Sequence, residues 1–155
     1  MKRVLVIILL IASAVSHISA QNVEVGAYAP PIENVEWISD KPELSPEKFL
    51  LIEFFHSANS DCRKEIEECN ERARIYRDAM DVIVLTREPS EQVAGMLLHQ
   101  YQYFYVATDE SGDTFRSFGT NHVPYALIVN PKGAIVWAGN PVRLTTTTID
   151  KILRL

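Results

Sequence analysis

The stretch FLLIEFFHSANSDCRKEIEECNE, residues 49–71, predicts a buried strand followed at once by an amphipathic helix. Residues 49–55 are apolar except for Glu53, a pattern that is typical of a strand in a sheet covered on both faces. From Ser60 to Arg77, apolar side chains recur at alternating spacings of four and three residues. Because this spacing places them on one side of a helix, the segment is predicted to pack an apolar stripe against the sheet.

Outward from this stretch, strands and helices alternate until about residue 118, and a hairpin then follows. The turn Asn130-Pro-Lys-Gly133 has proline second and glycine fourth, so the strands on either side of it should be antiparallel. This order predicts an α/β fold, with a central mixed sheet flanked by helices and a C-terminal hairpin and helix. Further strands are expected at 35–38, 81–86, 103–107, 125–129 and 134–138, and helical segments at 90–100, 114–118 and 148–155.

The first twenty residues have the composition of a secretory signal peptide. Two basic residues precede an apolar run over 4–15, and small residues up to Ala20 end the segment. The alternative is an N-terminal membrane anchor, but a spanning helix needs about 20 apolar residues and polar ones enter at Ser16. The chain is therefore predicted to consist of a signal peptide, 1–20, and one exported domain, 21–155, located in a periplasm or outside the cell.

The charge of this domain limits its partners. Two of the 15 basic residues and none of the 20 acidic ones lie in the first twenty, so their removal lowers the formal net charge from −5 to −7. An acidic domain without a basic stripe is a poor binder of nucleic acid or anionic membranes, and neither is expected as a partner of the mature chain. A domain of this size can bury a core without a metal or a disulfide. No cofactor is predicted.

Three segments resemble the secreted TlpA-type thiol–disulfide oxidoreductases, which have the thioredoxin fold. VGAYAPPIENVEW (25–37) is similar to that family's opening, a glycine and then Ala-Pro ahead of the first strand. LLIEFFHSANSDCRKEIEECNE (50–71) resembles its active-site segment, an apolar strand that runs into W-C-x-x-C-R-K-E at the start of a long helix. NHVPYALIVNPKGAIVWAG (121–139) resembles its cis-proline loop and final hairpin. The resemblance covers nearly all of 25–155 and implies a thioredoxin-like fold.

The chain departs from the family pattern where the chemistry would take place. In the alignment on Cys62-Arg-Lys-Glu65, Cys62 is the family's second cysteine, while the first falls on Asn59 and the preceding tryptophan on Ala58. In the family, the first cysteine is the exposed nucleophile and the second resolves the mixed disulfide. Asparagine can neither attack a disulfide nor leave as a thiolate, so a two-cysteine shuttle is excluded here. Asn59 is instead predicted to cap the helix, a position that asparagine favours.

The two cysteines are not expected to pair with each other. Cys62 and Cys69 are seven residues apart on the predicted helix, a rise of about 10.5 Å, whereas the Cα atoms of a disulfide usually lie within about 7 Å. Cys69 is predicted to be a small core residue. Two interpretations remain for Cys62, an inert core cysteine or a functional thiol. The helix N-terminus favours a thiolate at this position, while Asp61 and burial oppose one.

The resemblance also implies roles for Glu53 and for Val123-Pro124. Thioredoxin has a buried acid at the place that matches Glu53, so Glu53 is a candidate proton acceptor for Cys62. The alternative is a partly exposed glutamate, or one paired with a nearby lysine. Pro124 matches the family's cis-proline, and by resemblance the backbone of Val123 would pair with an extended substrate segment.

Three functional hypotheses therefore remain. The favoured hypothesis is a non-catalytic binding module that holds an extended peptide segment of a partner protein at Val123-Pro124. The second is a monothiol redox protein, in which Cys62 forms a mixed disulfide that an external thiol resolves. The third is a copper site formed by Cys62, His56 and His122, ligands that copper accepts.

Overall fold

The computed structural model describes residues 23–154, and the predicted signal peptide, 1–20, lies outside the described residues. The chain folds into an α/β domain whose elements follow the predicted order. Its strands are β1 (Glu36–Trp37), β2 (Phe49–Phe55), β3 (Met80–Thr86), β4 (Tyr105–Thr108), β5 (Tyr125–Val129) and β6 (Ile135–Gly139), and its helices are α1 (Ser60–Ile75), α2 (Ser90–Gln100), α3 (Asp113–Ser117) and α4 (Thr146–Ile152).

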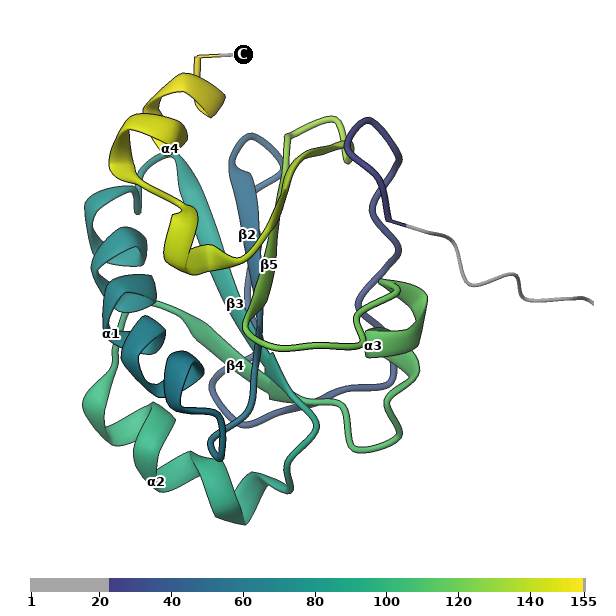
Figure 1. Cartoon of the computed structure of the whole chain (residues 1–155), viewed down its shortest axis with the longest axis vertical. Coiled ribbons are helices and arrows are strands. Elements are labelled where there is room, and N and C mark those ends of the chain that lie inside the picture. Colours follow the sequence, from purple (N-terminus) through teal and green to yellow (C-terminus); the bar gives the residue numbers. More distant parts are fainter. Residues whose placement is uncertain (1–22, 155) are drawn as a thin grey trace, which may run out of the picture.

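The strands form one six-stranded mixed sheet in the order β1-β4-β3-β2-β5-β6 (Figure 1). β2, β3 and β4 are parallel, as expected for strands joined by the helices α1 and α2. β5 runs antiparallel to β2, and β6 pairs with β5 as the predicted hairpin. The α/β prediction with mixed strand directions is therefore confirmed.

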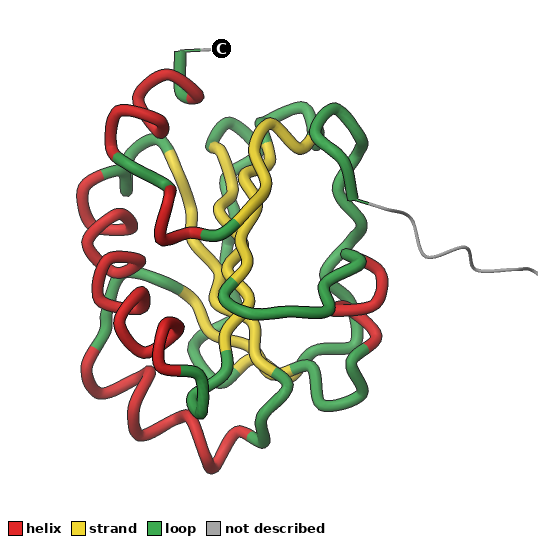
Figure 2. The backbone as a smooth tube through the Cα atoms, in the orientation of Figure 1, coloured by secondary structure: helices red, strands yellow, loops and turns green. Residues whose placement is uncertain are grey.

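The two faces of the sheet are covered differently. α1, α2 and α4 lie on one side, and α3 lies on the other together with the N-terminal segment (Figure 1). Figure 2 shows that the described part of this N-terminal segment, residues 23–48, is almost entirely loop. Side chains alternate along β2, so that Leu51 packs with Ile66 of α1 on one face, and Phe54 packs with Phe115 of α3 on the other. This two-sided burial explains the nearly continuous apolar run in β2.

The central position of β2 brings the segments of the site together. β2 is parallel to β3 and antiparallel to β5, and Phe54 at its carboxyl end lies opposite Tyr125 at the beginning of β5. The start of α1, the end of β3 and the turn at Val123-Pro124 therefore meet at one edge of the sheet. Ligand sites of open α/β sheets occur at this kind of edge.

The differences from the prediction lie at the ends of elements. The strand expected at 103–107 begins at Tyr105, and the first helix ends at Ile75 instead of residue 77. The last helix begins at Thr146, because the Thr145 hydroxyl accepts a hydrogen bond from the Thr148 N–H at 3.2 Å and caps it. Within residues 23–154, no helix is both long enough and apolar enough to cross a membrane.

Candidate functional site

Asn59 joins the start of α1 to the loop that precedes β5. Its Oδ1 accepts hydrogen bonds from the backbone N–H groups of Asp61, at 2.9 Å, and Cys62, at 3.1 Å. A helix leaves such N–H groups unpaired at its N-terminus, so Asn59 is the predicted N-cap. The Nδ2 of the same side chain donates to the carbonyl oxygen of Val123 at 3.1 Å. Asn59 therefore satisfies the helix start and ties it to the opposite side of the site.

The peptide bond between Val123 and Pro124 is cis. Pro124 is buried and Val123 is half-buried. Asn59 occupies one acceptor position on the Val123 carbonyl, whereas the Val123 N–H donates to no group within residues 23–154. A carbonyl oxygen has two lone pairs. The main chain of Val123 can thus offer a free donor and one remaining acceptor position to a ligand.

Cys62 lies in the first turn of α1 with its side chain 0% exposed. Burial raises the pKa of its thiol to about 11, and the negative charges of Glu53 and Asp61 act in the same direction. The backbone of His56 offsets only part of this rise. Desolvation therefore outweighs the helix N-terminus, and Cys62 is a protonated thiol at neutral pH.

Cys69 lies two turns further along α1 and is also fully buried. Both cysteines are free, in agreement with their seven-residue separation on one helix. Burial holds the pKa of the Cys69 thiol well above its usual value, and the nearby Glu53 raises it further. Its side chain belongs to the cluster between α1 and the sheet, so the prediction of a core residue is confirmed.

Glu53 is buried in the middle of β2 on the face that carries α1. Neither of its carboxylate oxygens has a hydrogen-bond partner among the described residues. Burial raises the pKa of this carboxyl from 4.5 to about 8, which keeps it protonated at neutral pH. The alternative of a partly exposed or lysine-paired glutamate is wrong, because the side chain is 0% exposed and forms no ion pair with a described residue.

The thiol that interacts most with Glu53 is that of Cys69. The neighbouring Cys69 thiol lowers the pKa of Glu53 and so offsets part of the effect of burial. The two groups do not meet the geometry of a hydrogen bond. On Cys62, Glu53 acts only through its charge. The proton exchange between Glu53 and Cys62 that the resemblance implies stays a prediction. Further along α1, a buried ion pair joins Glu65 and Arg72.

Glu88, which follows β3, holds the loop ahead of Asn59. Its carboxylate accepts hydrogen bonds from the Ser57 backbone N–H at 2.7 Å, from the Ser57 hydroxyl, and from the Thr86 hydroxyl at 3.1 Å. Glu88 was not among the residues predicted from the sequence. The available signal was an acid two residues after a buried strand, since the carboxyl ends of adjacent parallel strands meet at one edge of the sheet.

Cys62, His56 and His122 are not brought together as a metal site. The Nδ1 of His56 accepts the N–H of Ala58 at 3.1 Å and lies 3.6 Å from a carboxylate oxygen of Glu88. His122 is exposed, whereas Cys62 is buried. Across residues 23–154, no group of three or more His, Cys, Asp and Glu side chains could hold a metal ion. The copper alternative is therefore wrong.

The sequence matches no protein-family model and no curated protein, but the fold matches solved structures. A protein described as the thiol:disulfide interchange protein DsbE of Chlorobium tepidum is 19% identical, with a TM-score of 0.68 over 85% of this chain and 99% of that one. The thioredoxin domain of a thiol-disulfide oxidoreductase from Bacteroides vulgatus is also 19% identical, with a TM-score of 0.65 and the same coverage. An exposed lipoprotein thioredoxin from Streptococcus pneumoniae is 18% identical, with a TM-score of 0.59 over 70% of this chain and 85% of that one. The chain therefore has the predicted thioredoxin-like fold.

Proposed function

We propose that this chain is an exported protein, related to the TlpA-type thiol–disulfide oxidoreductases, that binds an extended peptide segment of a partner and does not exchange disulfides. The observation that carries this proposal is the position of Asn59. By resemblance, an attacking cysteine would occupy this place. Here an amide oxygen caps α1 and an amide nitrogen binds the Val123 carbonyl. The position is occupied by a side chain that holds the loop in place and has no nucleophile.

The remaining thiol is poorly suited to replace the missing one. Disulfide exchange requires an accessible thiolate. With a pKa of about 11, roughly one Cys62 thiol in 10⁴ would be ionised at pH 7. Its side chain is also 0% exposed. The monothiol hypothesis therefore requires the first turn of α1 to open before Cys62 can meet an external thiol.

Peptide binding needs only the main chain at this edge. An extended segment laid antiparallel to Val123 could accept a hydrogen bond from its N–H and donate to the free position on its carbonyl. This is the pairing of an antiparallel ladder, and it gives affinity without any cysteine. Ala58 and His122 are exposed in the two loops beside Val123, where side chains of the bound segment could contact them.

Export is the second part of the proposal. The basic start, apolar run and small residues before position 21 support secretion with cleavage after Ala20. One solved structure with this fold is described as an exposed lipoprotein, although the present segment contains no cysteine for lipid attachment. The intact mass of protein recovered from a bacterial periplasmic fraction would test this, since the mature chain should begin at Gln21.

The test of binding is a peptide titration followed by NMR. Random dodecapeptides are selected on the immobilised mature protein, and a selected peptide is then titrated into the ¹⁵N-labelled protein. We expect saturable shifts centred on the Val123 N–H, the Asn59 side-chain amide and residues 56–60. If no saturable peptide is found, or if the shifts centre on another surface, the proposal is wrong.

Three variants locate the site and separate the two hypotheses. Ala58→Lys should weaken peptide binding at least tenfold, whereas Thr147→Lys, which adds the same charge at an exposed position of α4, should leave it unchanged. Cys62→Ala should retain binding, and added dithiothreitol should have no effect. Loss of binding in Cys62→Ala, with a folded spectrum, would instead support the monothiol hypothesis.

A further inference from the structure

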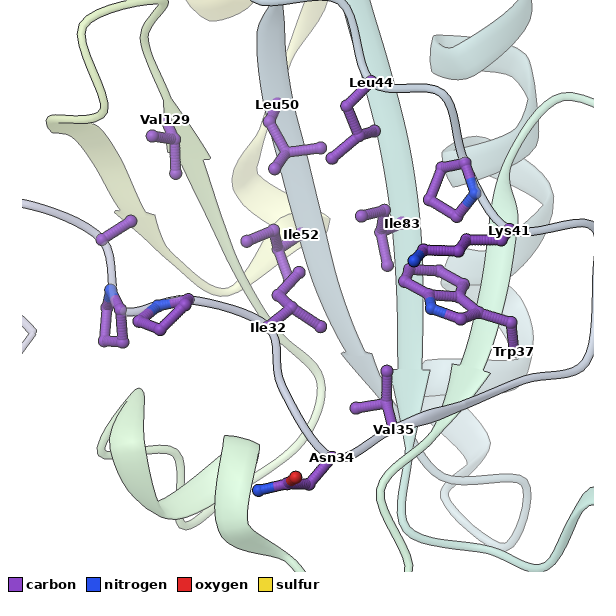
Figure 3. Close-up of a pocket in the computed structure, with 14 residues that line it drawn as sticks. Ile32, Asn34, Val35, Trp37, Lys41, Leu44, Leu50, Ile52, Ile83 and Val129 are labelled. Carbon is purple, nitrogen blue, oxygen red and sulfur yellow. The ribbon is translucent and has the colours of Figure 1, made fainter.

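A cavity of about 550 Å³ lies on the face of the sheet opposite α1, away from the cis-proline loop. Its floor is made by side chains of the central strands, including Ile52 and Ile83 (Figure 3). Its walls come from the N-terminal segment, in which Ile32, Trp37 and Leu44 face the strands. Small-molecule sites commonly have volumes of roughly 300 to 1,000 Å³ and mostly apolar linings.

The sequence explains why a loop instead of a helix covers this part of the sheet. Prolines at positions 30, 31, 42 and 46 prevent the N-terminal segment from forming a helix that could lay a continuous apolar stripe on the sheet. α3 is short and covers a neighbouring area, where Phe115 packs against Phe54 with ring centroids 4.8 Å apart. A loop therefore covers the part of the sheet around the buried side chains of Ile52 and Ile83, and the cavity lies between this loop and the strands.

One end of the cavity is lined by a lysine, Lys41. The lining is apolar except for Lys41, the indole N–H of Trp37 and Asn34. Figure 3 shows Lys41 extended across Trp37, with its amine end turned toward the strands. No described residue forms an ion pair with Lys41. In an acidic chain, this leaves a basic group at an apolar cavity with no protein acid bound to it.

We propose that this cavity binds a medium- or long-chain aliphatic carboxylate. The alkyl chain would lie between Leu50 of the sheet and Ile32 and Leu44 of the loop, whose side chains keep exposed apolar surface, and burial of this surface would drive binding. The carboxylate would meet the Lys41 amine and accept a hydrogen bond from the Trp37 indole, since charge-assisted hydrogen bonds are the strong ones. Sugars and nucleotides are poor candidates, because most of their polar groups would lose water here without gaining a partner. This site is separate from Val123-Pro124 and does not rest on the proposed peptide binding.

Calorimetric titration with dodecanoate, kept below the concentration at which it forms micelles, tests the proposal. We expect one dodecanoate per chain, and at least tenfold weaker binding of dodecyltrimethylammonium, which has an alkyl chain of nearly the same length and the opposite charge. Hexanoate should also bind at least tenfold more weakly, because it fills less of the cavity. Shifts of the ¹⁵N-labelled protein should centre on residues 29–44.

Two variants test the role of the charge. Lys41→Gln should weaken dodecanoate binding at least tenfold, whereas Lys151→Gln, an exposed control on α4, should leave it unchanged. Leu44→Glu places an acid at the rim, at a side chain that is 41% exposed and therefore tolerant of change, and should also weaken binding. If dodecanoate does not saturate a site, if both amphiphiles bind equally, or if Lys41→Gln has no effect, the proposal is wrong.

Discussion

Buried polar side chains in the loop ahead of α1 have hydrogen-bond partners, whereas one buried acid in the core beneath that helix has none. In the loop, the Glu88 carboxylate accepts three hydrogen bonds, and the Asn59 side chain makes three of its own. In the core, the Glu53 carboxyl has no hydrogen-bond partner among the described residues. Both acids are buried, and burial raises the pKa of the unpartnered Glu53 to about 8.

This difference identifies what each region can do. A buried polar group without a partner is costly unless it is neutral, so Glu53 is held as a protonated acid. Its state therefore depends on pH. The loop instead uses its donors and acceptors to fix one geometry, and a partner that binds there must use the main-chain groups that are left. Glu53 can therefore change its charge with pH, whereas the hydrogen bonds of Asn59 and Glu88 hold the loop in one arrangement.

The largest expected effect is on the pH dependence of folding stability. The folded Glu53 carboxyl binds its proton up to about pH 8, whereas an unfolded one releases it near 4.5. The folded state thus holds one more proton in this window, and the free energy of unfolding falls as pH rises, by on the order of 5 kcal/mol. Glu53→Gln should remove this fall, as measured by urea unfolding between pH 4.5 and 8.

The exposed Glu67 on α1 supplies the control. Glu67→Gln should keep the pH dependence of the wild type. If Glu53→Gln and the wild type lose stability in parallel as pH rises, Glu53 is ionised in the folded protein. The contrast between the loop and the core would then be wrong.

The next effect is on thiol reactivity in α1. The pKa of Cys62 is raised from 9.0 to about 11, which lowers its thiolate fraction at pH 8 about 100-fold. Iodoacetamide should therefore label the native protein at least about 100-fold more slowly than the protein in urea. After unfolding, mass spectrometry should find two labels and no disulfide, as expected for two free cysteines. Rapid labelling of Cys62 alone in the native protein would show that the loop opens, and would favour the monothiol hypothesis.

A smaller effect separates the two functions of the Asn59 side chain. Asn59→Ala loses the helix cap and the bond to Val123, which together should lower the free energy of unfolding by about 2 kcal/mol. Asn59→Asp keeps an oxygen for the cap but loses the donor, so it should lose about 1 kcal/mol. Urea unfolding of the two variants measures the difference. Equal values for both would show that the cap adds nothing to stability, and a wild-type value for Asn59→Asp would show that the bond to the Val123 carbonyl adds nothing.

Local patterns predicted most of the fold. The apolar run of β2, the stripe of α1 and the turn at Asn130 each specify one element, and the structure differs only at element ends. The cap at Asn59 was also predictable, because it depends on neighbouring residues in one turn.

The features that could not be predicted depend on contacts between residues far apart in the sequence. The bond from Asn59 to Val123 and the hydrogen bonds from Ser57 to Glu88 join segments that periodicity cannot pair. The position of Glu53 was predicted, but its depth and its proximity to Cys69 depend on how α1 packs against β2. The cavity near Lys41 also escaped prediction, because loops carry no periodic signal for the surface they cover.

The most direct test of the central claim is an insulin-reduction assay with dithiothreitol, performed on the wild type and on Asn59→Cys in parallel. The claim is that asparagine at this position removes disulfide exchange from a thioredoxin-like scaffold. The wild type should reduce insulin no faster than dithiothreitol alone. Asn59→Cys should show turnover above that background, because the new thiol and Cys62 would be one helical turn apart beside Val123-Pro124. Turnover by the wild type at the rate of a dithiol thioredoxin would contradict the claim.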